Sequence, residues 1–293
     1  MQYSYLDAKR IYHYTNAEGL LGILGGEWWA TEARYLNDPT ELLLGMTGFE
    51  DFVTHSPLSS VDRKRIVNTM QEEYSKLYGT GGYDEKFVIS FSFQKDSPLM
   101  WSEFPGFSGY CLGFDKHEIT SSFQNEEYEL VALGHVNYID DGSWGFDTAS
   151  LFFWAKKRDS KIEDAESALR LLAGCSHDTL RQECKEIAKS FFSSGALCKN
   201  SCFSREFEYR MVFAHKPRCD DECNTANPTV SFRVRNNSFI PFAKIKCSII
   251  NSLREICVGP TGDFAFVQRG LQRLLDSKGI SVPIEQSTVP LRY

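Results

Sequence analysis

The sequence predicts an α+β fold of mixed, mostly antiparallel sheets, and two observations lead to this prediction. Strand-like stretches with alternating apolar residues occur near the N-terminus, between residues 87 and 139 and after residue 204, without regular βαβ alternation. Between them, residues 150–196 have apolar residues at the three- and four-residue spacing of helices. We therefore expect one α+β domain over residues 1–293, with a helical insertion at about 150–196 that caps the sheet.

The composition is that of a soluble protein with a sizeable core. Of 293 residues, 42% are hydrophobic and 24% are charged, and the formal net charge is −7. This balance gives no overall basic footprint for nucleic acid. The N-terminus lacks the apolar core of a signal peptide, and no segment approaches the roughly 20 apolar residues of a membrane span. We expect a cytoplasmic protein with no membrane partner, and the sequence leaves the oligomeric state open.

The first predicted elements, within residues 10–26, place a histidine where a strand meets a helix. His13 and Thr15 share one face of the strand, and Thr15 with Glu18 has the spacing of a capping box. A glycine pair then ends the helix. His13 is thus expected beside the free N–H groups of a helix N-terminus, where a phosphate or carboxylate is stabilised. The alternative is a core histidine satisfied by a backbone carbonyl.

The next elements are a short strand at 27–31 and two helices. Asp38 suits a cap and Pro39 a first helical position, which predicts a helix over 42–52. A more polar helix is expected over 61–77.

The middle of the chain is expected to form strands over 87–93, 110–114 and 128–139. A loop between the first two exposes Trp101, which is either a lid over a ligand or a plug on the core.

The stretch 204–213 is the second informative one. A continuous strand there puts Glu206, Glu208 and Arg210 on one face and apolar side chains on the other. The charged face is either an ordinary solvated one or a device that holds one carboxylate oriented for general-base or electrostatic work.

The tail predicts further strands and one helix. Strands are expected near 230–234, 255–258 and 280–284, and a helix over 264–277 that Gly279 ends.

Eight of the nine cysteines lie in the second half of the chain, and in a cytoplasmic protein they should mostly be reduced. His215, Cys219 and Cys223 could be zinc ligands, with Cys202 or Cys247 as a fourth. Their spacing is not one of the strong zinc patterns, so ordinary thiols are the preferred interpretation and no metal is expected.

Several separated motifs resemble, in order, those of a bacterial family of domains of unknown function. The resemblance covers nearly the whole chain and brings no settled activity with it. The motifs are HYT at 13–15, NDPTE at 37–41, FS at 91–92 followed by Trp101, GFD at 113–115 and EFEYR at 206–210.

The order of a histidine strand, a helix, an aromatic residue and a late glutamate is also similar to the ADP-ribosyltransferase fold. That fold includes branches that modify nucleic acids and the RNA 2′-phosphotransferases. The resemblance implies that His13 holds the nicotinamide-side ribose of NAD and that Tyr35 packs on nicotinamide. It implies that Glu208, or alternatively Glu206, binds the ribose 2′-hydroxyl or activates the acceptor.

The same resemblance implies NAD as the substrate and further NAD contacts from other residues. Other aromatic residues, Tyr12, Trp28, Trp29 or Trp101, are alternatives to Tyr35 for stacking. The turn at 37–41 has a plainer alternative as a helix cap that fixes the cleft wall. The further contacts implied are Thr15, Asn16, Asn37, Trp101 and Arg210.

The leading hypothesis is an NAD-using ADP-ribosyltransferase or NAD glycohydrolase, with a possible role as a toxin or phage-defence effector. Its acceptor, protein, RNA or DNA, is not specified by the sequence. Cleavage of the N-glycosidic bond passes through an oxocarbenium-like centre, which a nearby carboxylate stabilises without a metal. The alternatives are a non-catalytic nucleotide or nucleic-acid sensor, and a metal-independent nuclease or phosphotransferase that uses His13, Arg210 and Glu208.

Overall fold

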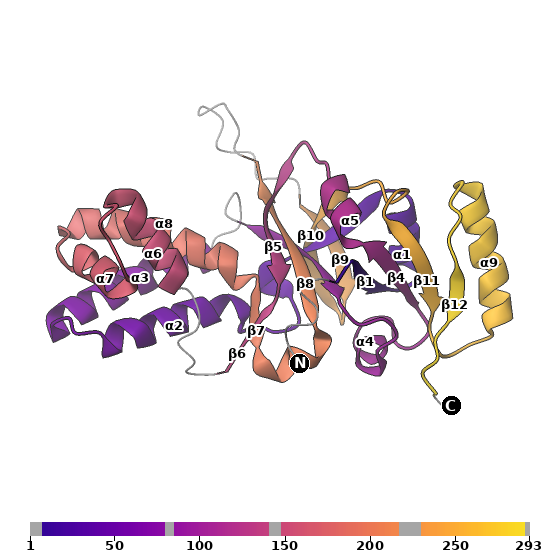
Figure 1. Cartoon of the computed structure of the whole chain (residues 1–293), viewed down its shortest axis with the longest axis horizontal. Coiled ribbons are helices and arrows are strands. Elements are labelled where there is room, and N and C mark those ends of the chain that lie inside the picture. Colours follow the sequence, from indigo (N-terminus) through magenta and orange to yellow (C-terminus); the bar gives the residue numbers. More distant parts are fainter. Residues whose placement is uncertain (1–7, 80–84, 141–147, 217–229, 291–293) are drawn as a thin grey trace.

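The computed structural model describes residues 8–79, 85–140, 148–216 and 230–290. It is a mixed α+β structure in which a layer of helices lies at one end of a large, mostly antiparallel sheet (Figure 1). The strands are β1 (Arg10–Thr15), β2 (Glu27–Glu32), β3 (Lys86–Ser92), β4 (Tyr110–Asp115), β5 (Tyr128–His135), β6 (Asn137–Ile139), β7 (Cys198–Asn200), β8 (Glu208–His215), β9 (Ser231–Arg235), β10 (Ser238–Lys246), β11 (Leu253–Val258) and β12 (Ile284–Gln286).

The helices alternate irregularly with these strands, as the sequence predicts. They are α1 (Ala17–Leu24), α2 (Glu41–His55), α3 (Ser60–Gly79), α4 (Pro98–Glu103), α5 (Lys116–Ser122), α6 (Thr148–Arg158), α7 (Ala165–Ala173), α8 (His177–Gly195) and α9 (Phe264–Ser277). Two 3₁₀ turns, η2 (Ala33–Tyr35) and η3 (Ser201–Glu206), precede α2 and β8.

Ten of the described strands form one sheet. Its main path runs β12-β11-β4-β1-β3-β2-β10-β9, while β8 pairs with the other edge of β3 and β5 pairs with β8. Only β11 and β12 are parallel neighbours within this path. The short parallel pair β6–β7 lies apart.

The sheet forks at β3, because β1 and β2 share one edge of that strand. At one end of this edge Ser92 pairs with Tyr12 of β1. At the other end Val88 pairs with Thr31 of β2. Residues 89–91 lie between these pairs, so β1 and β2 diverge there and leave a gap in the ladder.

Strands β3 and β8 carry two hydrophobic cores on their opposite faces. Ile89 and Met211 belong to the core formed with α1 and α9, whereas Val88 and Val212 belong to the core formed with the helical layer. This division follows from the two-residue period of side chains along a strand.

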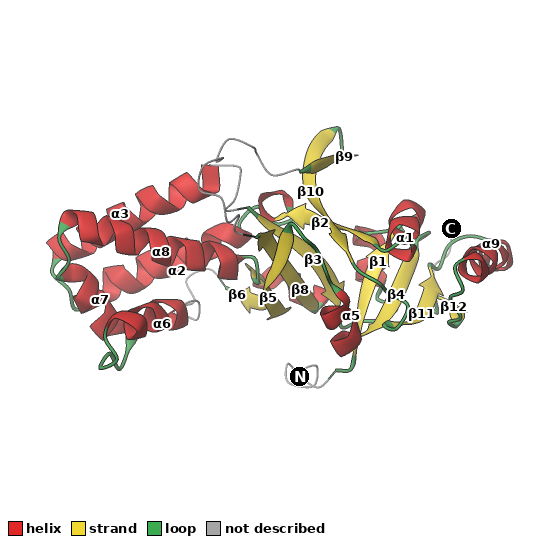
Figure 2. Ribbon diagram, turned by 90° about the horizontal axis from the view of Figure 1, so that it is seen from above, coloured by secondary structure: helices red, strands yellow, loops and turns green. Residues whose placement is uncertain are grey.

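The predicted helical insertion is present as α6, α7 and α8, but it does not stand alone. Helices α2 and α3 pack against α8 in the same layer and share its core (Figure 1). Figure 2 shows this layer at one end of the molecule and α9 at the other.

The start of α1 differs from the predicted capping box. Asn16, not Thr15, is the N-cap: its side-chain oxygen accepts a hydrogen bond from the Gly19 amide at 2.9 Å. Asn16 has the extended backbone that an N-cap requires, with φ of −87° and ψ of −178°. The glycine stop is present, since α1 ends at Leu24 and Gly26 has a φ of +82°.

Two other helix and strand boundaries were predicted wrongly. Pro39 is not the first position of α2, which runs from Glu41 to His55 and so includes the predicted 42–52. The Asp38 carboxylate instead accepts a hydrogen bond from the Thr40 amide at 2.8 Å, in a turn before the helix starts. The predicted strand over 204–213 begins only at Glu208, since Glu206 lies in η3 and Phe207 has a left-handed φ of +48°.

The hairpin β9–β10 extends the sheet beyond what the sequence patterns predicted. Strand β10 was not predicted, although Asn236 and Asn237 both have positive φ, which is the backbone of a two-residue hairpin turn. Strand β5 also ends earlier than expected, at His135, and Val136 separates it from β6.

The GFD motif at 113–115 has a packing role. A Cβ on Gly113 would lie 2.7 Å from the Cγ of Glu255 and 3.0 Å from the Cε1 of Tyr12. Asp115 caps α5 by accepting hydrogen bonds from the amides of His117 and Glu118. The motif therefore fixes the approach of β11 to β4 and starts the next helix.

Candidate functional site

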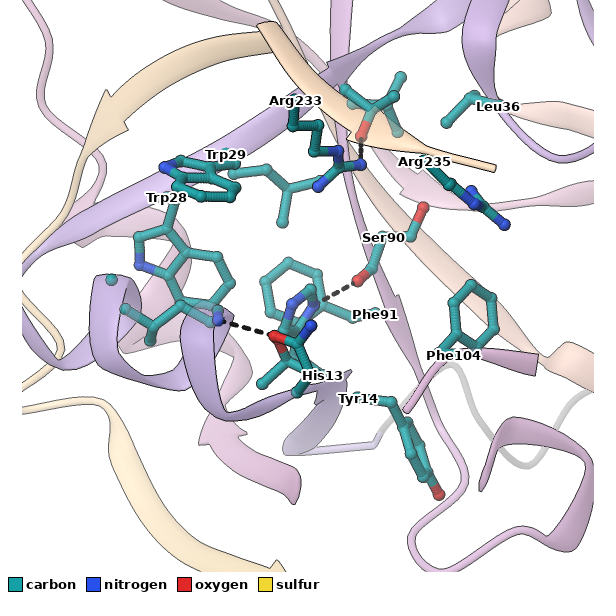
Figure 3. Close-up of a pocket in the computed structure, with 18 of the residues that line it drawn as sticks. His13, Tyr14, Trp28, Trp29, Leu36, Ser90, Phe91, Phe104, Arg233 and Arg235 are labelled. Atoms are coloured by element: carbon teal, nitrogen blue, oxygen red, sulfur yellow. Dashed lines mark hydrogen bonds between the residues drawn. The ribbon is translucent and has the colours of Figure 1, made fainter. Parts of the chain in front are cut away.

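A cavity of about 720 Å³ lies at the fork in the sheet, a size typical of small-molecule sites. Its walls come from β1, α1, β2, the middle of β3, α4 and β9, and several of the wall residues are labelled in Figure 3. Glu208, at the start of β8, also lines it. The gap between β1 and β2 thus brings residues from both ends of the chain to one space.

His13 lines this cavity and has a fixed orientation. Its Nδ1 is 2.8 Å from the backbone carbonyl of Ser90, in the stretch of β3 between the two branches (Figure 3). Its ring meets the rings of Trp28 and Phe91 edge-on, with centroids 5.2 and 5.6 Å away. His13 is thus hydrogen-bonded to a backbone carbonyl, as in the alternative of a core histidine, but it also lines the cavity.

The surroundings of His13 keep it neutral. Burial, together with the nearby positive charge of Arg233, lowers its pKa to about 4. Because the Ser90 carbonyl can only accept, Nδ1 carries the proton. The Nε2 atom is then an acceptor, suited to a hydroxyl donor in the cavity.

Glu208 belongs to a buried charge cluster of five side chains, Glu41, Lys199, Glu206, Glu208 and Arg210. The Glu208 carboxylate is 2.8 Å from Nη2 of Arg210 and 3.3 Å from Nζ of Lys199. Arg210 also makes a bidentate pair with Glu41 at 2.6 and 2.9 Å. The charged strand face is therefore not solvated. It joins β8 to α2 and β7.

Burial opposes ionisation in this cluster, but unequally. For Glu208, Arg210 and Lys199 outweigh burial and hold the carboxyl pKa below its ordinary value. Burial raises the pKa values of Glu41 and Glu206 despite their cationic partners. Glu208 is thus the carboxylate of the cluster that stays ionised most readily, and it is the one that lines the cavity.

Glu206 and Arg210 do not reach the cavity. Glu206 is buried and its carboxylate lies 2.7 Å from Nζ of Lys199. Arg210 is fully buried, and its guanidinium also donates to the Ala196 carbonyl at 2.9 Å. The structure therefore does not place Arg210 at the cavity, where the resemblance implies a contact with NAD, and its hydrogen bonds instead hold Glu208.

Aromatic side chains surround His13, but Trp101 is not one of the cavity walls. Trp101 is fully buried, packs edge-on against Tyr14 and donates to the Asp96 carboxylate at 2.8 Å. Of the two alternatives, Trp101 is therefore a plug on the core and not a lid over a ligand. Phe104, in the same predicted loop, lines the cavity and is 41% exposed. Tyr35, the last residue of η2, also lines it and is 44% exposed.

The other predicted contacts lie on the walls. Thr15 and Asn16 line the cavity at the start of α1, where the Asn16 side chain is already bonded to the Gly19 amide. Asn37 lines it too, and its Oδ1 accepts from Nζ of Lys199 at 3.1 Å. The 37–41 turn thus acts as a wall that is tied to the charge cluster.

The residues that sequence reasoning missed include two arginines of the cavity wall. Arg233 and Arg235 lie on β9, and Arg233 donates to the Thr31 hydroxyl at 2.7 Å (Figure 3). The signal available was the alternation in Ser231–Arg235, which puts the two arginines on one strand face.

The zinc hypothesis falls mainly on undescribed residues. Cys219 and Cys223 lie outside the described ranges. The His215 ring packs against Phe87 and Tyr128. Seven cysteines of the described part have free thiols. Within those ranges no group of three or more histidine, cysteine, aspartate or glutamate side chains could hold a metal ion. Within them also, every helix is too short or too polar to cross a membrane.

Comparison with known proteins adds no assignment: no family model, no curated protein and no solved structure matches this chain.

Proposed function

We propose that the protein cleaves the nicotinamide–ribose bond of NAD and transfers the ADP-ribose to an acceptor or to water, as an ADP-ribosyltransferase-like enzyme. The observation that supports this proposal is the convergence of a neutral His13 and an ionised Glu208 on one cavity from distant strands. The proposed cleavage uses a histidine and a carboxylate, and both lie at the fork in the sheet.

Each residue has a defined task in the proposed reaction. Nε2 of His13 accepts a hydrogen bond from a ribose hydroxyl, and an aromatic wall residue stacks on nicotinamide. The bond between the ribose C1′ and the nicotinamide nitrogen breaks, and both electrons leave with nicotinamide. Glu208 stabilises the positive charge that develops on the ribose. An oxygen nucleophile then adds to C1′ and releases its proton.

Two alternatives are less well supported. A nuclease or phosphotransferase that uses Arg210 on its substrate requires an accessible guanidinium, and Arg210 is fully buried and paired with two carboxylates. A non-catalytic sensor needs the cavity but does not need an ionised Glu208. The charge cluster nevertheless keeps the pKa of Glu208 below its ordinary value, although burying these charges costs desolvation free energy.

The test is nicotinamide release from NAD by the purified protein, followed by chromatography with and without cell extract. We expect release by the wild type and a loss of at least a hundredfold in His13→Ala and Glu208→Gln, on the order of a lost electrostatic catalytic contact. Glu206→Gln should lose less, since Glu206 does not line the cavity.

The matched control is Glu73→Gln, which removes another buried, ion-paired carboxylate, on α3 and away from the cavity. It should keep wild-type release. Absence of release by the wild type, together with NAD binding that persists in Glu208→Gln, would instead support the sensor alternative.

A further inference from the structure

We propose that Arg233 and Arg235 form a binding site for a diphosphate group on the β9 wall of the cavity. Both side chains extend from the same face of β9, on the side that faces Ser90 (Figure 3). Residues two apart on a strand are separated by about 7 Å, so two guanidinium groups can grip one diphosphate from adjacent positions.

Among the described residues, these arginines have no carboxylate partner. Arg233 is half-buried and Arg235 is exposed, and the one side-chain hydrogen bond of Arg233 to a described residue goes to the neutral hydroxyl of Thr31. Arg34 and Arg210, the other arginines with mostly buried side chains in this region, each pair with two carboxylates. Even the partial burial of a guanidinium without a counter-charge is unfavourable, and a bound anion offsets that cost.

The carboxylates around the cavity do not supply this counter-charge. Four carboxylates line it, those of Glu18, Glu27, Glu103 and Glu208, and in the described structure none forms an ion pair with Arg233 or Arg235. Glu27 instead pairs with Lys244 at 3.2 Å, and Glu208 is held within the charge cluster. Burial and the adjacent Arg235 lower the pKa of Arg233, which is the expected effect of a cation kept from water beside a second cation.

The start of α1 is a poorer anion site than the sequence suggested. The Asn16 side chain already accepts from the Gly19 amide, and Glu18 adds a negative charge to the first turn. The phosphates of a nucleotide in this cavity are therefore expected on the opposite wall, at the two arginines.

This site deepens the proposed function, because it orients a dinucleotide with its diphosphate on β9 and its reacting ribose at His13. Its ligand chemistry, however, is shared by any nucleoside diphosphate. The binding test is therefore independent of NAD cleavage.

The experiment is calorimetric titration of the full chain with ADP, AMP, adenosine, inorganic pyrophosphate and NAD. We expect ADP to bind at least tenfold more tightly than adenosine, and Arg233→Gln and Arg235→Gln each to weaken ADP about tenfold, as for a lost charge-assisted hydrogen bond. Binding of adenosine should not change. Arg233→Lys should recover part of the affinity, because it retains the charge.

The control is Arg269→Gln on α9, which makes the same change of charge at an exposed position outside the cavity. Equal ADP affinities in all three glutamine variants would overturn the proposal, as would equal affinities of the wild type for ADP and adenosine. If pyrophosphate binds as tightly as ADP, the site is assigned to free diphosphate. Normal ADP binding without NAD cleavage leaves this site standing and removes the proposed function.

Discussion

His13 is a residue whose chemistry is set by its neighbours. A carbonyl of β3 fixes the proton on Nδ1, two aromatic rings pack edge-on against the imidazole, and Arg233 adds a positive charge nearby. The result is an imidazole that stays neutral at physiological pH.

This environment predicts a pH dependence of stability. In the unfolded chain histidine binds a proton below about pH 6.5, whereas folded His13 binds one only near pH 4. The native state is therefore destabilised as the pH falls through this window. Urea unfolding at pH 7.5 and 4.5 should show that the wild type loses roughly 2 kcal/mol more than His13→Gln between the two values.

The comparison needs a second histidine variant, since every titrating group contributes to the total. His177 is an exposed residue of α8, and His177→Gln should lose as much stability as the wild type over the same interval. Identical pH dependence in the wild type and His13→Gln would contradict a neutral, desolvated His13.

At this scale the sequence singled out two residues, His13 and Glu208, that the structure brings to one cavity. His13 and Glu208 stood out because histidine and glutamate on strands suggest catalysis. Arg233 and Arg235 did not, because arginines on a short strand look like an ordinary solvated face. The roles of Glu206 and Arg210 depended on burial and on the left-handed Phe207, which side-chain periodicity does not reveal.

At the scale of elements, the buried charge cluster is the joint between α2 and β8. Glu41 from the first turn of α2 and Glu208 at the start of β8 both pair with Arg210. Lys199 adds β7 to the same joint.

Removing the shared cation should be costly. Arg210→Met leaves Glu41 and Glu208 buried without their main partner, and we expect a loss of about 3–5 kcal/mol in the free energy of unfolding. Arg170→Met breaks an exposed pair with Glu166 on α7 and should cost less than about 1 kcal/mol. Denaturant unfolding measures both, and equal small losses would show that the cluster is not a structural joint.

Element prediction succeeded where a local pattern decides the structure. The apolar stripe and the glycine stop of α9 gave its bounds, 264–277, correctly. Strand β10 was missed because Pro241 interrupts its pattern and because its pairing with β2 is a contact between distant parts of the sequence. The association of α2 and α3 with α6–α8 is also such a contact.

At the scale of the whole molecule, two cores share two strands. Leu169 of α7 is fully buried in the core of the helical layer, and Ile256 of β11 is fully buried in the core of the sheet. Because β3 and β8 contribute to both cores, the two should unfold together.

The prediction is a single transition that either core can shift. Leu169→Ala and Ile256→Ala should each lower the free energy of unfolding by about 2–5 kcal/mol, with coincident curves from circular dichroism and tryptophan fluorescence. A separate early transition that only Leu169→Ala displaces would show that the helical layer unfolds independently.

The fork at β3 also bears on how this architecture can be redesigned. Backbone pairing creates the opening, since β1 and β2 leave the same strand in different directions. Exchanging the side chains that line it therefore changes which molecule is recognised while the hollow itself persists. The same fold can therefore acquire a different ligand specificity through substitutions of single wall residues.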